Sequence, residues 1–265
     1  MTGTRIVKLK LEEDGSPEKL PQLMGDKTDE IVRVYRETGF DSFHYINYYN
    51  EMLRRTAKYN LTPKQLQNVV TVLELERSRS LDKYQPSAGL FITALIQNSG
   101  HDRFEFRVRE RLSRLGHRLA SGKEIIVDGD VENFTGESLQ GGSITVDGSA
   151  RECTGSSMRK GKILVKHSCE NYTGSGMSGG SITVEGRAGD ETGHEMKGGT
   201  IRVDYHVGDK TGQRMSGGLI DVGMTAGHDT GEKAFGGIIK VGGEIKGISP
   251  RFHGDELWEN GEKIR

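Results

Sequence analysis

Residues 173–191 read TGSGMSGGSITVEGRAGDE, and the next nineteen, residues 192–210, read TGHEMKGGTIRVDYHVGDK. Each unit opens with Thr-Gly, carries Gly-Gly near its middle and continues into an Ile-x-Val triplet. Thr-Gly recurs six times with a period of nineteen residues and no insertion, starting at positions 135, 154, 173, 192, 211 and 230. Because a unit this short cannot bury its apolar side chains alone, the repeat predicts a stacked solenoid.

The Ile-x-Val triplets have the period of two that a β-strand requires, so both side chains point to one face. The isoleucines share one phase of the repeat, at positions 144, 163, 182, 201, 220 and 239. In stacked coils each column becomes an apolar ladder, and the threonine hydroxyls are expected to bond along the stack or to turn backbone. The glycines mark tight turns.

These columns predict an α+β chain built around a parallel β-helix of about seven 19-residue coils. The coils are expected over residues 122–247, after a mainly helical domain over residues 1–121 and before a C-terminal tail or cap over residues 248–265. Pro250 stands where the next Thr-Gly would fall and is expected to end the coils.

The first 121 residues show helical rather than repeating patterns. Alternating apolar residues predict a short strand over residues 7–11, followed by a loop over residues 12–25. Helices are expected over residues 28–38, after Ser42, from the capping box Thr62-Pro63-Lys64-Gln65 onward, and over residues 87–98.

The stretch 104–119 has two patterns at once. Phe104, Phe106 and Val108 alternate as in a strand, and Phe106 and Val108 are in phase with the Ile-x-Val columns. Val108 also begins a helical spacing that continues through Leu112, Leu115 and Leu119. We expect a strand that turns into a helix covering the open end of the solenoid, because solenoid ends need such covers.

Composition narrows the classes of function. Residues 1–121 carry 20 Lys/Arg and 16 Asp/Glu, an asymmetry too mild to indicate nucleic acid. The six arginines between Arg103 and Arg118 are expected to form a solvated helix face or a partner contact. No signal peptide or membrane span is indicated. Cys153 and Cys169 occupy different columns, so we expect no disulfide and a reduced, cytoplasmic protein.

No residue set indicates catalysis, so no catalytic, cofactor-binding or metal site is assigned. His194 with Glu195, or His206 with Asp204, could in principle bind a metal, but isolated surface histidines are the preferred interpretation. One column is uniformly polar, with Asn133, Glu152, Asn171, Asp190, Asp209 and His228 two residues before each Thr-Gly. It is either an external row suited to a cationic partner or a set of turn residues bonding their own backbone, and the turn interpretation is preferred.

The motif Gly186-x-x-Gly189-x-x-x-Gly193, with weaker copies around Gly208 and Gly227, resembles a known repeat. Together with the stretch 174–203, it resembles the β-helical subunit of formylmethanofuran dehydrogenase and the C-terminal domain of the glutamate synthase large subunit. The resemblance covers about 126 residues, from 122 to 247. Both families imply a right-handed parallel β-helix that acts as a scaffold.

By this resemblance the chain is a non-catalytic scaffold subunit of a multisubunit oxidoreductase in one-carbon metabolism. A molybdenum- or tungsten-pterin and other metals would then belong to partner subunits, and this chain would hold no cofactor and show no activity alone. A glutamate-synthase-type protein acting with separate subunits is one alternative. A stand-alone enzyme with a site between the helical domain and the β-helix is another. Self-association into a homo-oligomer stays open.

Overall fold

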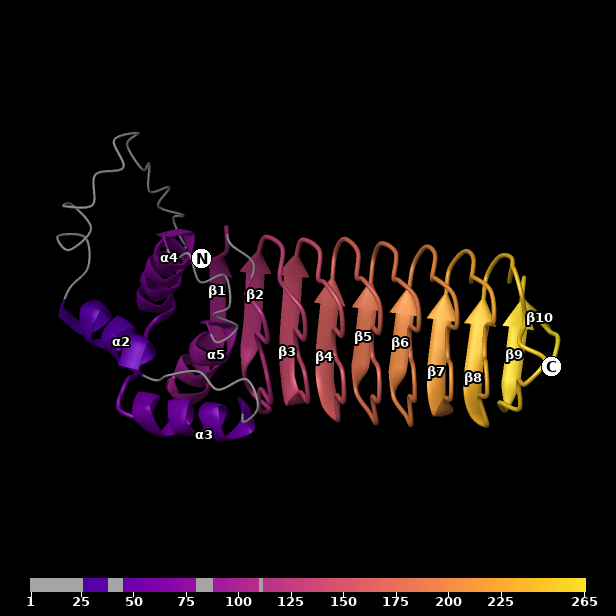
Figure 1. Ribbon diagram of the computed structural model, residues 1–265, viewed down its shortest axis with the longest axis horizontal. Helices are drawn as coiled ribbons and strands as arrows, with labels where there is room; N and C mark the ends of the chain where they lie inside the picture. The colour runs from indigo at the N-terminus through magenta and orange to yellow at the C-terminus, as the bar shows by residue number, and fades with distance from the viewer. Residues whose placement is uncertain (1–25, 38–44, 80–87, 110–111) are drawn as a thin grey trace, which may run out of the picture.

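The computed structural model describes residues 26–37, 45–79, 88–109 and 112–265. In this part of the chain, a cluster of helices leads into a long rod of parallel strands (Figure 1). The expected strand over residues 7–11, the loop after it, the predicted helix end at residue 38 and Ser42 lie outside the described residues.

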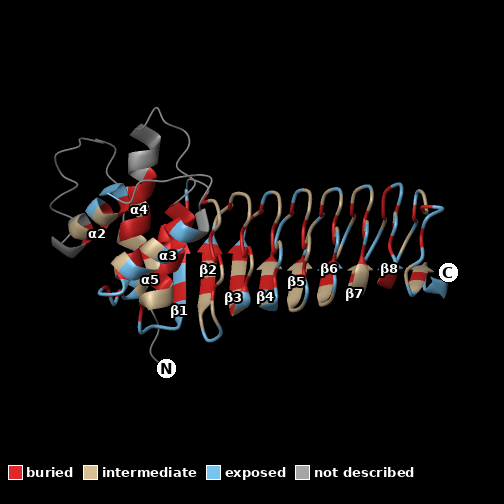
Figure 2. Ribbon diagram, turned by 60° about the horizontal axis from the view of Figure 1, so that its bottom comes forward, coloured by how far each residue is buried: buried red, intermediate tan, exposed pale blue. Residues whose placement is uncertain are grey.

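The helices are α2 (Asp26–Glu37), α3 (Tyr45–Thr56), α4 (Pro63–Arg79) and α5 (Ala88–Asn98), in agreement with the expected mainly helical beginning. The capping box at the start of α4 is confirmed, because the Gln65 backbone N–H donates to Thr62 Oγ1 and the Thr62 N–H donates to Gln65 Oε1. Residues 88–96 of α5 are all buried, so this helix is the centre of the helical part (Figure 2).

The strands lie side by side in chain order. They are β1 (Arg103–Arg107), β2 (Glu124–Asp128), β3 (Gln140–Asp147), β4 (Lys160–Val165), β5 (Ser181–Val184), β6 (Thr200–Val203), β7 (Ser216–Val222), β8 (Gly236–Val241), β9 (Glu256–Glu259) and β10 (Glu262–Lys263). From β1 to β9 each strand pairs in parallel with the next, and Ile144 aligns with Ile163 and Ile163 with Ile182. The predicted parallel β-helix and its register are confirmed.

The ladder extends one strand beyond the predicted coils at each end. At the start, β1 pairs Phe104 with Ile125 and Phe106 with Val127, so the expected register of Phe106 with Ile125 was wrong by two residues. At the end, β9 pairs with β8 and aligns Leu257 with Ile239. Pro250 therefore does not end the ladder.

The expected helix after residue 108 was also wrong. Residues 114–118 form a turn, with positive φ at Arg114, Gly116 and Arg118, and complete a coil with β1. The cover over the open end is α5 instead, where a Cβ on Gly89 would lie 2.0 Å from the Ser113 carbonyl oxygen. The Thr93 hydroxyl of α5 also accepts a hydrogen bond from the Gly116 N–H.

Side chains of α4 cover the free edge of β1. Gln67 Oε1 accepts the Arg107 N–H at 2.7 Å, its Nε2 donates to the Arg107 carbonyl at 3.2 Å, and Glu74 Oε1 accepts the Arg109 N–H at 2.7 Å. At the other end, β10 folds back antiparallel on β9. Side chains of α4 thus cover part of the edge of β1, and the two-residue strand β10 covers β9, which disfavours open-ended strand pairing between molecules.

The glycine of each Thr-Gly pair has a packing role as well as a turn role. Gly155 has φ of +68°, and a Cβ there would lie 2.4 Å from Cδ1 of Ile182 in a neighbouring coil. The same relation holds between Gly174 and Ile201, at 2.3 Å. Each isoleucine therefore fills a hollow that only glycine leaves open, which locks neighbouring coils together.

Candidate functional site

The uniformly polar column forms a ladder of hydrogen bonds between coils. Asn171 Oδ1 accepts the Asp190 N–H at 2.9 Å, Asp190 Oδ1 accepts the Asp209 N–H at 2.8 Å, and Asp209 Oδ1 accepts the His228 N–H at 2.7 Å. Asn133 makes the equivalent bond to the Glu152 N–H at 3.3 Å. These side chains act on backbone, as the preferred interpretation held, but on the backbone of the next coil rather than their own.

The second glycine of the repeat motif makes room for this ladder. A Cβ on Gly189 would lie 2.3 Å from Asn171 Oδ1, and one on Gly208 would lie 2.0 Å from Asp190 Oδ1. Gly227 stands in the same relation to Asp209, also at 2.3 Å. The motif is therefore explained by the stack: a glycine in each of these coils lets the amide or carboxylate of the preceding coil reach the backbone.

The threonine column is used in the same way, inside the rod. All six threonines are 0 % exposed, and each hydroxyl donates to the carbonyl oxygen three residues earlier at 2.9–3.1 Å. The Thr192 bond to the Gly189 carbonyl is one example. Of the two expectations for this column, bonding to turn backbone is the one observed, so these hydroxyls are structural groups and not candidate nucleophiles.

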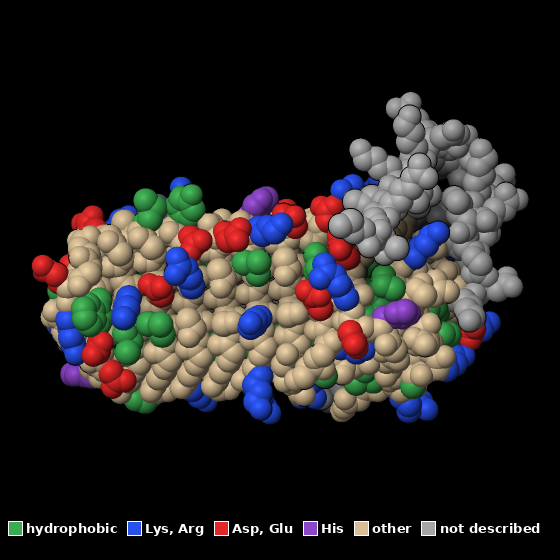
Figure 3. Space-filling model, turned by 180° about the vertical axis from the view of Figure 1, so that it is seen from behind, with side chains coloured by type: hydrophobic (Ala, Val, Ile, Leu, Met, Phe, Trp, Pro, Cys, Tyr) green, Lys and Arg blue, Asp and Glu red, His purple; other side chains and the backbone are tan. Residues whose placement is uncertain are grey.

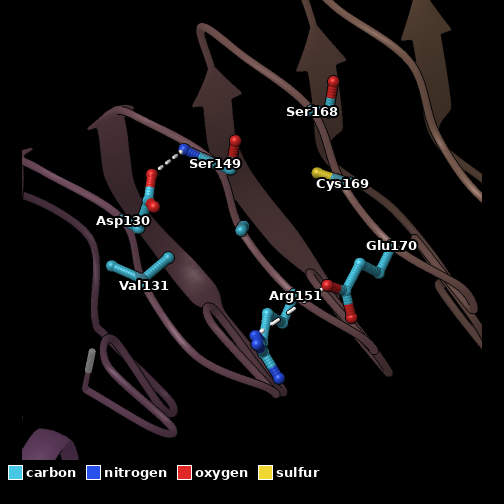
Figure 4. Close-up of a pocket in the computed structure, with 8 residues that line it drawn as sticks. Asp130, Val131, Ser149, Arg151, Ser168, Cys169 and Glu170 are labelled. Atoms are coloured by element: carbon cyan, nitrogen blue, oxygen red, sulfur yellow. Dashed lines mark hydrogen bonds and ion pairs between the residues drawn. The ribbon is translucent and has the colours of Figure 1, made fainter.

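One small pocket of about 220 Å³ is lined by residues 130–131, 149–151 and 168–170 of three successive coils (Figure 4). Its polar groups already bind one another: Asp130 accepts the Ser149 N–H at 2.8 Å, and Arg151 pairs with Glu170 at 3.8 Å. The Cys169 residue is 5 % exposed, and burial raises the pKa of its thiol to about 12. It is therefore overwhelmingly a neutral thiol at neutral pH, which is the unreactive form.

The second cysteine is likewise a free thiol, as expected for a reduced protein. Cys153 is half-buried, and burial, followed by the charges of Glu152 and Glu137, raises its pKa. Neither cysteine has the electropositive surroundings that activate a nucleophile.

The histidines named as metal candidates have hydrogen-bonding roles. His194 Nδ1 lies 2.6 Å from Glu191 Oε2, while Glu195 Oε1 is 3.5 Å from Nε2. His206 bonds Thr225 at 2.7 Å, while Asp204 pairs with Arg202. Among the described residues, no three His, Cys, Asp or Glu side chains are arranged to hold a metal ion.

A buried cluster of ionisable side chains lies at the junction of the helices and the rod. Arg114 and His117, in the turn after β1, both bind the Glu137 carboxylate of the next coil; the His117 Nδ1 contact is 3.1 Å. His117 is 1 % exposed and Glu137 is 9 % exposed. The Arg114 guanidinium also lies 4.2 Å from the centroid of the Phe134 ring, so its positive charge is stabilised by both the carboxylate and the aromatic face.

The electrostatics of this cluster favour the ionised carboxylate. Burial is the largest single influence and raises the pKa of Glu137, but the His117 hydrogen bond and the Arg114 charge and hydrogen bond outweigh it, so the pKa is lowered. On the helical side, the Tyr49 ring of α3 meets the His117 ring edge-on with centroids 4.9 Å apart. Burial raises the pKa of the Tyr49 hydroxyl well above its usual range.

Sequence patterns did not reveal this cluster, because Arg114 and Glu137 are 23 residues apart and share no motif. The other described arginines of the stretch 103–118 are not on a helix as expected; they are Arg103, Arg107, Arg109 and Arg118. Arg103 pairs with Glu124 at 3.0 Å and Arg107 with Asp128 at 2.5 Å, both across the β1–β2 pair. Their expected role as a partner contact stays a prediction.

In comparisons with known proteins, no family model matches the chain, and no curated protein is significantly similar to it. Among the described residues, no helix is long and apolar enough to cross a membrane.

Proposed function

We propose that this chain is a non-catalytic scaffold subunit of a multisubunit oxidoreductase, most similar to the β-helical subunit of formylmethanofuran dehydrogenase. The observation that carries the proposal is the use of the repeated polar residues. The threonine column and the Asn/Asp ladder, with bonds such as Asn171 to Asp190, bind backbone within or between coils. Repetition in this sequence therefore maintains a straight rod and does not assemble a reactive group.

The shape of the rod supports the same proposal. Helix α5 covers one end and the β9–β10 hairpin covers the other, so the long sides are the surfaces that stay available (Figure 1). A stiff rod with covered ends and long, exposed sides is suited to holding several larger subunits at fixed positions. The redox cofactors would then reside in those partner subunits.

The stand-alone enzyme is the alternative that one observation favours. It would place its site between the helices and the rod, where His117, Glu137 and Arg114 meet. Against it, His117 is 1 % exposed and packs against the Tyr49 ring, so a substrate has no access to the imidazole in this arrangement. The cluster is better explained as a polar anchor between the helical part and the first two coils.

The test is recovery of the tagged chain from its native source under mild conditions, followed by mass spectrometry and an activity screen with metals added back. We expect larger, metal-containing subunits to copurify, and the isolated chain to show no dehydrogenase or hydrolase turnover. Recovery of a lone protein with robust turnover that His117→Gln abolishes without unfolding would overturn the scaffold proposal in favour of the enzyme.

A further inference from the structure

Charge is unevenly distributed around the rod, although the whole chain has a formal net charge of −1. Each coil contains a six-residue segment that ends immediately before the Ile of its Ile-x-Val triplet and includes the Gly-Gly position. These segments, which we call the basic strip, are residues 138–143, 157–162, 176–181, 195–200, 214–219 and 233–238. They contain six Lys/Arg and a single carboxylate, Glu195.

The rest of the coils has the opposite balance. The thirteen-residue segments between consecutive parts of the strip, within residues 144–232, contain eleven Asp/Glu and five Lys/Arg. Because every coil repeats the same path, this segregation places the positive charge along one side of the rod. The strip contains the starts of β3 to β8, which form the lower edge of the rod in Figure 1. In Figure 3 the same lower edge, seen from behind, carries Lys and Arg side chains.

The cations of the strip are exposed and mostly unneutralised. Arg159, Lys160, Lys162 and Lys197 are exposed, and within the described part of the chain none of them forms an ion pair. Only Arg214 and Lys233 have carboxylate neighbours, at 3.3 Å and 3.4 Å. Elsewhere on the coils, Arg151, Lys166 and Arg202 pair with carboxylates, as Lys166 does with Asp147 of the preceding coil at 2.8 Å, whereas Arg187 and Lys210 form no ion pair within the described part of the chain.

Two further features distinguish the last three parts of the strip, residues 195–200, 214–219 and 233–238, from a solvated row of charges. A pocket of about 370 Å³ lies between Glu195, Lys197, Arg214, Ser216, Lys233 and Phe235. Phe235 is 68 % exposed, although a large aromatic ring gains by being covered.

We propose that the basic strip is a docking groove for an acidic, extended segment of a partner protein, with an apolar side chain of that segment covering Phe235. The excess of cations in the strip favours a negatively charged partner segment. The exposed ring of Phe235 favours an apolar side chain within that segment. The proposal deepens the scaffold function and rests on it, because it names the surface by which a partner is held.

A first experiment uses the full-length protein and a fluorescein-labelled peptide of glutamates with one central phenylalanine, in anisotropy titrations. The test variant is Arg159→Glu with Lys197→Glu and Lys233→Glu. The matched control is Lys166→Glu with Arg187→Glu and Lys246→Glu, which changes the net charge equally at exposed positions outside the strip. Circular dichroism and thermal melts establish that both variants are folded.

We expect the test variant to bind the peptide at least about tenfold more weakly than wild type, and the control to stay within about threefold. The contrast should shrink at high salt, because the Debye length falls to about 3 Å at 1 M ionic strength. Phe235→Ser should weaken binding of this peptide but not of one without phenylalanine. Equal weakening by both triple variants, no binding by wild type, or tighter binding of single-stranded RNA than of the peptide would overturn the proposal.

A pull-down from the native source with the same variants separates this proposal from the scaffold function. If wild type recovers partner subunits and the strip variant loses one that the control retains, the groove is supported. If wild type and strip variant recover the same partners in equal amounts, the groove proposal fails while the scaffold function stands. If wild type recovers no partners, the scaffold function fails, and with it the proposal that rests on it.

Discussion

A direct test of the interlocked coils is the pair Gly155→Ala and Ile182→Val. The methyl added at Gly155 would lie 2.4 Å from Ile182 Cδ1, well inside van der Waals contact, and Gly155 has φ of +68°. Ile182→Val deletes that Cδ1 atom and leaves the rest of the side chain in place. If the isoleucine fills the hollow over the glycine, each change alone is harmful and the second relieves the first.

The magnitudes follow from the contact. Alanine at this positive φ costs about 1 kcal/mol in backbone strain, and overpacking in a dense core adds about 2 kcal/mol. Ile182→Val alone leaves a small void and costs about 1 kcal/mol. Additivity would therefore give about 4 kcal/mol for the double variant. We expect about 2 kcal/mol, because the new methyl occupies the space that Cδ1 vacated and only the strain and minor misfit persist.

The assay is urea unfolding followed by circular dichroism, with free energies from linear extrapolation. Gly174→Ala is the matched control, since its φ is +70° and its closest contact is Ile201 Cδ1 at 2.3 Å, while Ile182 Cδ1 is 3.4 Å away. Ile182→Val should partly rescue Gly155→Ala, whereas in the Gly174→Ala background its own cost of about 1 kcal/mol should simply add. Additive free energies for both pairs would show that the isoleucine ladder is not seated on the glycines.

Three further predictions test the face assignment of the strands, the buried ion cluster and the covered sheet edge. Ile182→Asp buries an unpaired carboxylate and should unfold the protein, whereas Thr183→Asp, half-buried between rungs, should change stability by less than about 1 kcal/mol; equal melting temperatures would show that the faces are misassigned. Glu137→Gln should cost about 3 kcal/mol near neutral pH, and because the folded pKa is lowered, the difference from wild type should diminish as pH falls below the ordinary value of 4.5; a pH-independent difference would contradict this. Gln67→Ala should accelerate amide hydrogen exchange at Arg107 and cost about 2 kcal/mol, and unchanged exchange there would contradict an edge-covering role.

The sequence contained enough to predict the coils, because the periodic positions are those whose burial the stack requires. Ile144 and Ile163 share a phase, and they are paired partners in the structure. The outer positions of the same strands, such as Thr183, are less constrained and vary between coils. Equal spacing thus translated directly into equal position, without any knowledge of turn geometry.

The first coil was mispredicted for a physical reason. Its turn places Leu112, Leu115 and Leu119 inside the rod, at spacings of three and four residues. Later coils do the same with buried positions four residues apart, such as Ala150, Thr154 and Met158. Inward positions of this turn therefore have nearly the spacing of a helix face, and without the Thr-Gly signature the two are indistinguishable by periodicity.

The positive φ angles in the turns could not be predicted from the residue types either. Phe134, Cys153, Tyr172, Glu191, Lys210 and Asp229 occupy one column and all have positive φ, between 54° and 65°. None is glycine, although this region is unfavourable for most side chains. Their N–H groups bond mostly to the next coil, as Tyr172 does to the Asp190 carbonyl at 2.9 Å. The hydrogen bonds between coils outweigh the cost of a positive φ for these side chains, so residue preferences alone do not predict this conformation.

The basic strip shows how a surface property can be present in the sequence and still be missed. Counted along the chain, the charges of the two halves differ only slightly, and the total is −1. Counted by position within the coil, six cations and Glu195 separate from eleven carboxylates and five cations. Chain order is irrelevant to an approaching partner, since residues nineteen apart are neighbours in space. For a solenoid, the coil position is therefore the coordinate in which electrostatics must be analysed, and in that coordinate this nearly neutral protein has one side with an excess of positive charge.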